Sequence, residues 1–436
     1  MKKYGIYIYV LIVCLSGCRH MDEFQINPNQ PTVGTPETFL TGVEQELFSG
    51  ILAYETISAA SRYLIGFSSH SEEYQYYRWA YGSFGRYSSI RNIMEMERSA
   101  NENSNYLAIA KLFKSIFFYE LTMRFGDIPY SQSMQLVEGI DKPKYDSQKD
   151  VFIGILKELE EANSMFSLRD NSISGDFIFN GDILKWKKFN NSFKLRVLLS
   201  LSHYENDTDL NIKSVFSEMM NNPAEYPVFT GNEDNGQRIG NTIAPHPFFS
   251  DQGFISYIGL EKDFADALKT RNDPRLKFYA EMTADAKERR LSVDDMNAYD
   301  GLPGSASNDE NTQNMLKASI PSMNYYTKES YEPVLYMGYY EVNFLIAEAI
   351  FRNWWKEENA EEYYKKGIKA SMDYWNISET EINEYLAQDN VKFNSEAALE
   401  MILIQKYLAS YLNSGWEAFY TQRRTGIPIF DVSGDG

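Results

Sequence analysis

The sequence predicts a mostly α-helical protein, and three observations support this fold class. Apolar residues recur at helical spacing in several stretches, the alternation typical of strands is scarce, and small residues in one pair of segments allow two helices to pack closely. Of the 436 residues, 43% are hydrophobic and 24% are charged, which is typical of a globular chain. No linker divides the chain clearly into domains.

Three apolar stripes predict the first helices. One stripe covers 109–121 and ends at "RFGDIPYS", where Gly126 and Pro129 interrupt a helix. A second stripe covers 152–166, and a third lies within "GDILKWKKFNNSFKLRVLLSLS", residues 181–202. Each has the i, i+3, i+4 spacing of a helix that buries one face.

Two segments lack this periodicity and are expected to be loops. Residues 221–258 are rich in Gly, Asn and Pro, and "DGLPGSASNDENTQ" covers 300–313. Long loops within a compact protein often carry function.

The C-terminal third predicts a helix hairpin of the tetratricopeptide kind. "EVNFLIAEAIFRNW" (341–354) is followed by "NAEEYYKKGIKASMDYW" (359–375), and small residues such as Gly367 allow close contact. A strict 34-residue repeat is not visible. A last long helix is expected in "SEAALEMILIQKYLASYLN" (395–413), before "SGWEAFYTQRRTGIPIF".

The N-terminus has the pattern of a lipoprotein signal peptide. Two lysines precede a short apolar run, and "LSGC" resembles the bacterial lipobox, which predicts removal of residues 1–17 and acylation of Cys18. The alternative is an ordinary signal peptide with an incidental cysteine. Arg19 favours delivery to the outer membrane. The proline-containing segment 18–39 is expected to be a flexible tether, followed by a helical domain over 40–436.

Charge and hydropathy exclude several classes of partner. The formal net charge of −19 argues against nucleic acid, which requires a basic surface. No apolar run after the signal peptide approaches the ~20 residues of a membrane-spanning helix. The chain is therefore expected to be attached to a membrane by lipid alone.

Six stretches, in order along the chain from about Leu40, resemble SusD/RagB-type proteins. They are "FFYELTMRFGDIPYSQSMQ" (117–135), "YDSQKDVFIGILKELEEA" (145–162), "FNGDILKWKKFNNSFKLRVLLSLS" (179–202), "RNDPRL" (271–276), "GYYEVNFLIAEA" (338–349) and "QKYLASYLNSGWEAFYTQRRTGIP" (405–428). The resemblance implies an outer-membrane lipoprotein with the SusD-like helical fold and long ligand-binding loops. It also implies that the protein forms a lid on a SusC-like TonB-dependent transporter and captures a nutrient, usually a glycan, with a peptide as the alternative. Relatives continue beyond "RRTG-P", so the C-terminal packing segment is expected to be short.

Residues within the family segments are expected to be mainly structural. Trp186, Arg196, Arg423 and Arg424 match these segments. The arginines are expected to bind backbone carbonyls or carboxylates within the helical body.

Three aromatic-rich segments are candidates for ligand binding. An aromatic ring can receive the C–H face of a sugar, but one ring that buries ~100 Å² contributes at most ~2.5 kcal/mol, so two or three must converge. The candidates are Tyr74, Tyr76, Tyr77, Phe248, Phe249, Tyr257, Tyr325 and Tyr326. Trp79 and Tyr87 are expected to begin a helix and pack inward. The alternative for the first three tyrosines is that they only cap the core.

No motif indicates catalysis or a cofactor. None of the four histidines has HExxH spacing, and GxSxG and GxGxxG are absent from the sequence. Asp294, Asp295 and Asp300 could bind Ca²⁺, but they lack EF-hand spacing, so a solvated loop is favoured. We predict a binding protein without cofactor or metal, and the alternative class is a glycan-cleaving enzyme that uses a carboxylate pair.

Overall fold

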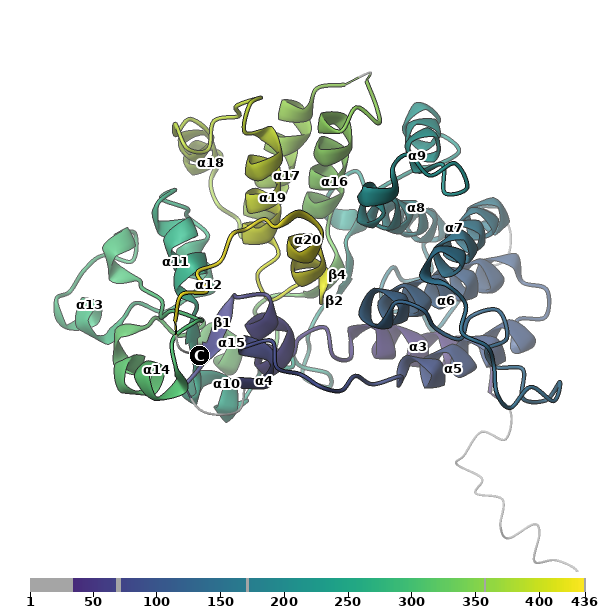
Figure 1. The fold of residues 1–436 in the computed structure, drawn as a ribbon, viewed down its shortest axis with the longest axis horizontal. Helices are drawn as coiled ribbons and strands as arrows, with labels where there is room; N and C mark the ends of the chain where they lie inside the picture. Colours follow the sequence, from purple (N-terminus) through teal and green to yellow (C-terminus); the bar gives the residue numbers. More distant parts are fainter. Residues whose placement is uncertain (1–33, 68–71, 170–171, 357, 435–436) are drawn as a thin grey trace, which may run out of the picture.

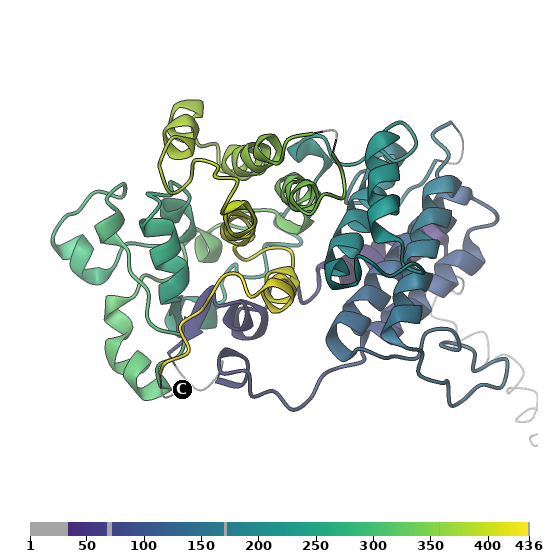
Figure 2. The same ribbon diagram turned by 45° about the horizontal axis from the view of Figure 1, so that its top comes forward.

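The structure is a computed structural model and describes residues 34–67, 72–169, 172–356 and 358–434. Helices dominate it, and they form two groups that lie side by side (Figure 1). The first group contains α3 (Pro36–Phe48), α5 (Arg86–Ser99), α6 (Ser104–Phe125), α7 (Gln148–Met165), α8 (Ile183–Ser200) and α9 (Ile212–Asn221). Figure 2 shows their axes packed next to each other.

The second group contains the C-terminal half of the chain. Its longer helices are α11 (Lys262–Lys269), α16 (Tyr339–Phe351), α17 (Ala360–Tyr374), α18 (Glu379–Leu386), α19 (Ala398–Ala409) and α20 (Glu417–Thr425). Its shorter ones are α10 (Gln252–Ser256), α12 (Leu276–Tyr279), α13 (Ala284–Glu288), α14 (Asn308–Asn314) and α15 (Asn324–Thr327). One short helix from the N-terminal part, α4 (Glu72–Gln75), lies beside this group (Figure 1).

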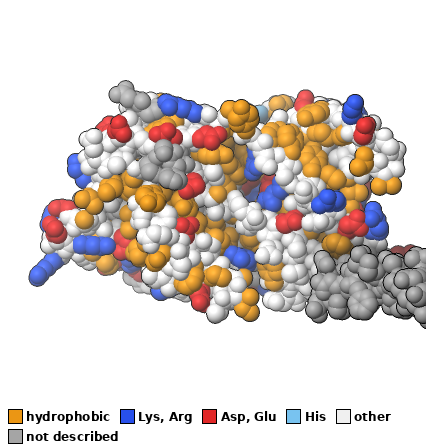
Figure 3. All heavy atoms as spheres, turned by 90° about the horizontal axis from the view of Figure 1, so that it is seen from below, with side chains coloured by type: hydrophobic (Ala, Val, Ile, Leu, Met, Phe, Trp, Pro, Cys, Tyr) orange, Lys and Arg blue, Asp and Glu red, His pale blue; other side chains and the backbone are white. Residues whose placement is uncertain are grey.

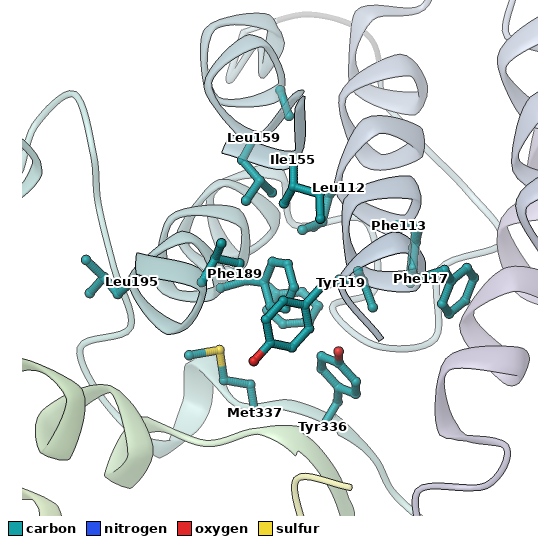
Figure 4. Packing of buried hydrophobic residues seen from close by; sticks show 14 of the residues in the cluster. Leu112, Phe113, Phe117, Tyr119, Ile155, Leu159, Phe189, Leu195, Tyr336 and Met337 are labelled. Carbon is teal, nitrogen blue, oxygen red and sulfur yellow. The ribbon is translucent and has the colours of Figure 1, made fainter. Parts of the chain in front are cut away.

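The three helices predicted from apolar stripes are confirmed as α6, α7 and α8. The side chain of Asn103 caps the start of α6 by accepting from the backbone of Asn105 and Tyr106. The helix ends at Gly126, whose φ of +75° lies in the left-handed region that glycine adopts readily. The buried faces of α6, α7 and α8 meet in one core that includes Met337, as Figure 4 shows with Phe113, Ile155 and Phe189.

The predicted hairpin is also confirmed, by α16 and α17. Gly367 lies against Phe344: a Cβ added to this glycine would be 2.7 Å from two atoms of the phenyl ring. The two helices therefore approach each other more closely than a larger side chain would allow.

Four short strands form two antiparallel pairs. β1 (Leu64–Gly66) pairs with β3 (Ile258–Leu260), and β2 (Gly236–Arg238) pairs with β4 (Val334–Met337). Both pairs join segments far apart in the sequence. Each strand has only three or four residues, and β1, β3 and β4 are buried along their whole length, so none of these three shows the alternation of a half-buried strand.

The structure corrects three predicted boundaries. Helix α3 starts at Pro36, inside the range 18–39 assigned to the tether. The predicted loop 221–258 contains β2 and α10, and the predicted loop 300–313 contains most of α14. The side chain of Ser307 caps α14 by accepting from the backbone N–H of Glu310, a local signal that the surrounding Gly and Asn content obscured.

Buried ion pairs connect helices, one of them across the two groups and one within the second group. Arg196 on α8 donates to both carboxylate oxygens of Glu341 on α16, at 2.9 and 2.7 Å, and both side chains are buried. Arg424 on α20 donates to Glu348 on α16. These contacts confirm the structural roles expected for the two arginines and hold α20 in place.

No helix in the described residues combines the length and apolar character that crossing a bilayer would require. The predicted signal peptide, residues 1–17, and Cys18 lie outside the described residues.

Candidate ligand-binding cleft

A wide cleft opens between the two helix groups. It has a volume of about 1110 Å³ and is lined by α3, α5 and the end of α6 on one side and by α20 on the other. The loop 76–85, between α4 and α5, crosses from one group to the other (Figure 1) and contributes its side chains to the lining. Figure 3 shows a hollow between the two halves, with hydrophobic side chains on its rim.

Four rings gather in this cleft, and we call them the aromatic cluster: Tyr74, Trp79, Trp416 and Phe419. Tyr74 and Trp79 stack, with ring centroids 5.4 Å apart and planes 25° from parallel. Phe419 lies 5.6 Å from Trp79 and 5.5 Å from Trp416, both edge to face. Three of the four rings remain partly exposed, as an apolar surface for a ligand must.

The backbone explains why two rings only five residues apart can stack. Tyr77 has a φ of +55°, in the left-handed region, so the chain reverses direction after α4. This turn returns Trp79 onto Tyr74. Trp416 is the residue before the first turn of α20, so the position of that helix sets the other half of the cluster.

Arginines accompany the rings. The guanidinium of Arg124, in the last turn of α6, lies 5.6 Å from the ring centroid of Trp416. Arg423, in the last turn of α20, lies 5.5 Å from that of Phe419. A third, Arg86, donates to the Glu120 carboxylate at 2.6 Å. The cleft thus offers apolar ring surface beside cationic hydrogen-bond donors.

The first predicted segment contributes only part of its tyrosines to the cleft. Tyr74 lines it, whereas the hydroxyl of Tyr76 donates to the carbonyl of Ala306 at 2.8 Å and that of Tyr77 to the carbonyl of Ala60 at 2.9 Å. The expectation that Trp79 begins a helix and packs inward is wrong. Trp79 belongs to the loop and lines the cleft, because the helix starts only at Arg86.

The second and third predicted segments pack against each other, away from the cleft. The prediction that Phe248 and Tyr325 offer their rings to a ligand is wrong. The two residues are 2% and 0% exposed, so their rings have no free face. Phe248 stacks on Phe254 at 4.0 Å, and the Tyr325 hydroxyl bonds to the buried Glu332.

The other three predicted rings of these segments stay partly accessible. Phe249 and Tyr326 are half-buried, and Tyr257 is 50% exposed. The Tyr326 hydroxyl donates to Gln252 at 3.3 Å. None of the three lines the cleft in the described structure, so a role in ligand binding there stays a prediction.

Sequence reasoning missed Trp416, Phe419 and Tyr81 as cleft residues. Tyr81 is 88% exposed, Trp416 directly precedes α20, and Phe419 lies on that helix. Arg423 was also expected to bind a carboxylate or carbonyl, but it is exposed at the cleft. The run of aromatics around "WEAFY" was the available signal, yet nothing local shows that it meets Tyr74.

In the acidic loop, each of the three aspartates contacts a lysine or caps a turn. Lys277 binds Asp294 at 2.9 Å, Asp295 caps a short 3₁₀ turn, and Asp300 faces Lys269 at 3.3 Å. Within the described ranges, no group of three or more His, Cys, Asp or Glu side chains is arranged to hold a metal ion.

Comparisons with known proteins agree with this architecture. A family profile described as "Starch-binding associating with outer membrane" matches residues 28–436. An outer-membrane protein of Bacteroides vulgatus, connected with nutrient binding, is 33% identical with a TM-score of 0.85, over 91% of this chain and 90% of its own. A SusD homologue of Bacteroides fragilis is 33% identical with a TM-score of 0.83, over 91% and 89%.

More distant structures share the fold. A chitin-binding SusD homologue of Flavobacterium johnsoniae is 18% identical with a TM-score of 0.71, over 91% of this chain and 87% of its own. The search of curated proteins found no match. Helical architecture, family profile and relatives together define the class of protein, that of outer-membrane nutrient-binding proteins. Within this class, the chain belongs to the SusD-like family.

Proposed function

We propose that this protein is a cell-surface lipoprotein that binds an oligosaccharide or polysaccharide in the cleft and delivers it to a SusC-like TonB-dependent transporter. The observation that carries the proposal is the aromatic cluster, which places four rings in one open cleft of about 1110 Å³. The family, described as starch-binding and associated with the outer membrane, supports both the ligand class and the location.

The geometry of the cluster fits a sugar-binding surface. Sugar rings need apolar faces for their C–H groups and polar partners for their hydroxyls, and the cleft supplies rings, arginines and serines together. Each ring contributes about 1–2.5 kcal/mol, so several rings must act jointly to reach a useful affinity. Avidity from a transporter that contacts the same ligand would add to this.

Binding is tested with the purified full-length protein and starch or chitin oligosaccharides by isothermal titration calorimetry. Tyr81→Ala and Trp416→Ala are expected to lower affinity about tenfold, the loss of roughly 1.4 kcal/mol of contact. Tyr81 is the cleaner variant because its ring is 88% exposed and supports no core. The matched control is Tyr204→Ala, an exposed aromatic outside the cleft lining. Unchanged affinity in both cleft variants would show that the ligand binds elsewhere.

The same samples separate binding from catalysis. A binding protein returns the oligosaccharides intact after prolonged incubation, whereas an enzyme releases shorter products. Measurable turnover that one Glu→Gln substitution abolishes would replace the proposal with the enzyme alternative.

The anchor and the partner need separate tests. Metabolic labelling with a fatty-acid analogue should mark the wild-type protein and not Cys18→Ser, and membrane fractionation should lose the variant. Affinity purification from its own outer membrane should recover a TonB-dependent barrel. Labelling that survives Cys18→Ser would contradict the predicted anchor, and purification without a barrel would contradict the predicted partner.

A further inference from the structure

The charge of the cleft differs from that of the whole chain. Acidic residues outnumber basic ones by 61 to 42 overall, but three arginines and two glutamates line the cleft. One of the arginines, Arg86, is occupied by Glu120. Arg124 and Arg423 are the other two arginines of the lining.

Arg124 and Arg423 are exposed and have no carboxylate partner. Neither forms an ion pair with any residue in the described ranges, although acidic side chains are abundant in this chain. By contrast, the buried Arg196, Arg275 and Arg424 each bind a carboxylate. The two cleft arginines are thus available to an external anion.

The two guanidiniums lie beside neighbouring rings of the aromatic cluster. Arg124 comes from α6 and Arg423 from α20, so they stand on opposite sides of the cleft. Each lies over a ring of the aromatic cluster, and these two rings, Trp416 and Phe419, have centroids 5.5 Å apart. Stacking on the rings restrains the guanidiniums and reduces the entropy lost when they bind.

The two glutamates of the cleft do not neutralise these arginines. Glu46 accepts from the side-chain amide of Asn92 at 2.9 Å, and Glu73 is exposed on α4. Neither glutamate forms an ion pair with Arg124 or Arg423 in the described ranges, so the positive charge of both arginines stays available to a ligand.

We propose that the ligand is an acidic glycan, whose carboxylate or sulfate groups bind Arg124 and Arg423 while a neighbouring sugar ring lies on the aromatic cluster. This inference rests on the proposed function and specifies its substrate class. Guanidinium groups bind planar carboxylates and sulfate oxygens through two parallel hydrogen bonds, which an ammonium group cannot do. The pairing also explains why a strongly acidic protein places unpaired cations beside its aromatic rings.

The test compares charged glycans with matched neutral ones by titration calorimetry on the full-length protein. Oligogalacturonates are paired with their carboxyl-reduced forms, and chondroitin sulfate oligosaccharides with desulfated forms, so the two sources of negative charge are distinguished. Neutral starch and chitin oligosaccharides and an oligoglutamate peptide complete the panel. We expect at least one acidic glycan to bind ten or more times more tightly than its neutral partner, and more weakly as salt is raised.

Variants link this preference to the two residues. Arg423→Gln and Arg124→Gln should each remove most of the roughly tenfold preference for the acidic glycan. Arg423→Lys should retain only part of it, because lysine keeps the positive charge but lacks the paired donors of a guanidinium. Arg290→Gln, an exposed arginine outside the cleft lining, is the control and should change nothing. Thermal unfolding checks that all variants remain folded.

The outcomes separate this inference from the proposed function. If neutral glycans bind as well as acidic ones, the inference fails and the proposed function stands. If the arginine variants keep the full preference, or oligoglutamate binds as tightly as the glycans, the inference is also overturned. If no glycan binds at all, both fail.

Discussion

Glu348→Gln should destabilise the protein strongly, because this buried carboxylate holds α20 against α16. The side chain of Glu348 is 1% exposed and accepts from Arg424 at 2.5 and 2.8 Å and from Arg352 at 2.9 Å. An amide at this position would turn a donor toward an arginine that carries only donors. The variant would leave Arg424 charged, buried and without its partner.

The magnitude follows from the pKa of the carboxyl group. Burial raises this pKa, but the charge and hydrogen bonds of Arg424, with Arg352, outweigh burial and lower it from 4.5 to about 2. The pKa of Glu348 is thus lower by roughly 2.5 in the folded than in the unfolded protein, which corresponds to about 3 kcal/mol of stabilisation at neutral pH. Breaking a buried ion pair by removing one partner costs about 3–5 kcal/mol in other proteins, which agrees.

The sign of the pH dependence provides a second readout. Since the folded pKa is depressed, the stabilisation is complete above the unfolded pKa near 4.5 and is lost as pH falls toward 2. The free energy of unfolding of wild type should therefore exceed that of Glu348→Gln by about 3 kcal/mol at pH 7, and the gap should close between pH 4.5 and 2.

The assay is guanidinium unfolding followed by circular dichroism and tryptophan fluorescence. Glu361→Gln is the matched control, because Glu361 forms an exposed pair with Lys365 on α17 and should change stability by less than about 0.5 kcal/mol. A Glu348→Gln variant within about 1 kcal/mol of wild type at pH 7, or a gap that stays constant with pH, would refute the reasoning.

Three further perturbations are expected to have distinct effects on stability. Burial, and then the charge of Asp176, raise the pKa of Glu44 to about 10, so above pH 4.5 the protein must take up a proton on this carboxyl group when it folds. Glu44→Gln removes this cost and should raise the free energy of unfolding in urea titrations by about 1–3 kcal/mol at pH 7 and little at pH 4. Destabilisation at pH 7 would contradict this. Asp176→Ala should lower the free energy of unfolding, measured by chemical denaturation, by about 3 kcal/mol or more. The reason is that the Asp176 carboxylate accepts hydrogen bonds from three backbone N–H groups and from Trp186, at 2.8–2.9 Å. A loss under about 1 kcal/mol would show that water replaces these hydrogen bonds. Gly367→Leu should lower the melting temperature, because a Cβ alone would already lie 2.7 Å from the Phe344 ring. Gly42→Leu is its control, because Gly42 is partly exposed on α3 and an added Cβ there would meet no atom within 4 Å.

Local patterns allowed much of the helical framework to be predicted. The apolar stripes of α6, α7 and α8 and the small residues at the α16–α17 contact depend on residues three or four positions apart, so a single stretch contains the whole signal. The same patterns failed for α14, whose cap Ser307 stands among Gly and Asn residues, and for the start of α3, which begins at Pro36 without a side-chain cap.

The candidate site was predicted less well because its parts are distant in the sequence. Tyr74 was identified from local aromatic density, but so were Phe248 and Tyr325, which the fold buries. Density of rings does not distinguish a core from a surface, since both favour the same residues.

The sequence alone determined the helical class, the acidic charge, the predicted lipid attachment at Cys18 and the SusD/RagB resemblance. Only the tertiary structure decided that Trp416 and Phe419 meet Tyr74 and Trp79, and that Arg124 and Arg423 remain without carboxylate partners within the described residues. The reason is physical. Helix formation depends on neighbours within one or two turns of the same stretch. The cleft, by contrast, forms where packing and buried ion pairs bring together α6, α20 and a loop, whose residues are spread over more than 300 positions of the sequence.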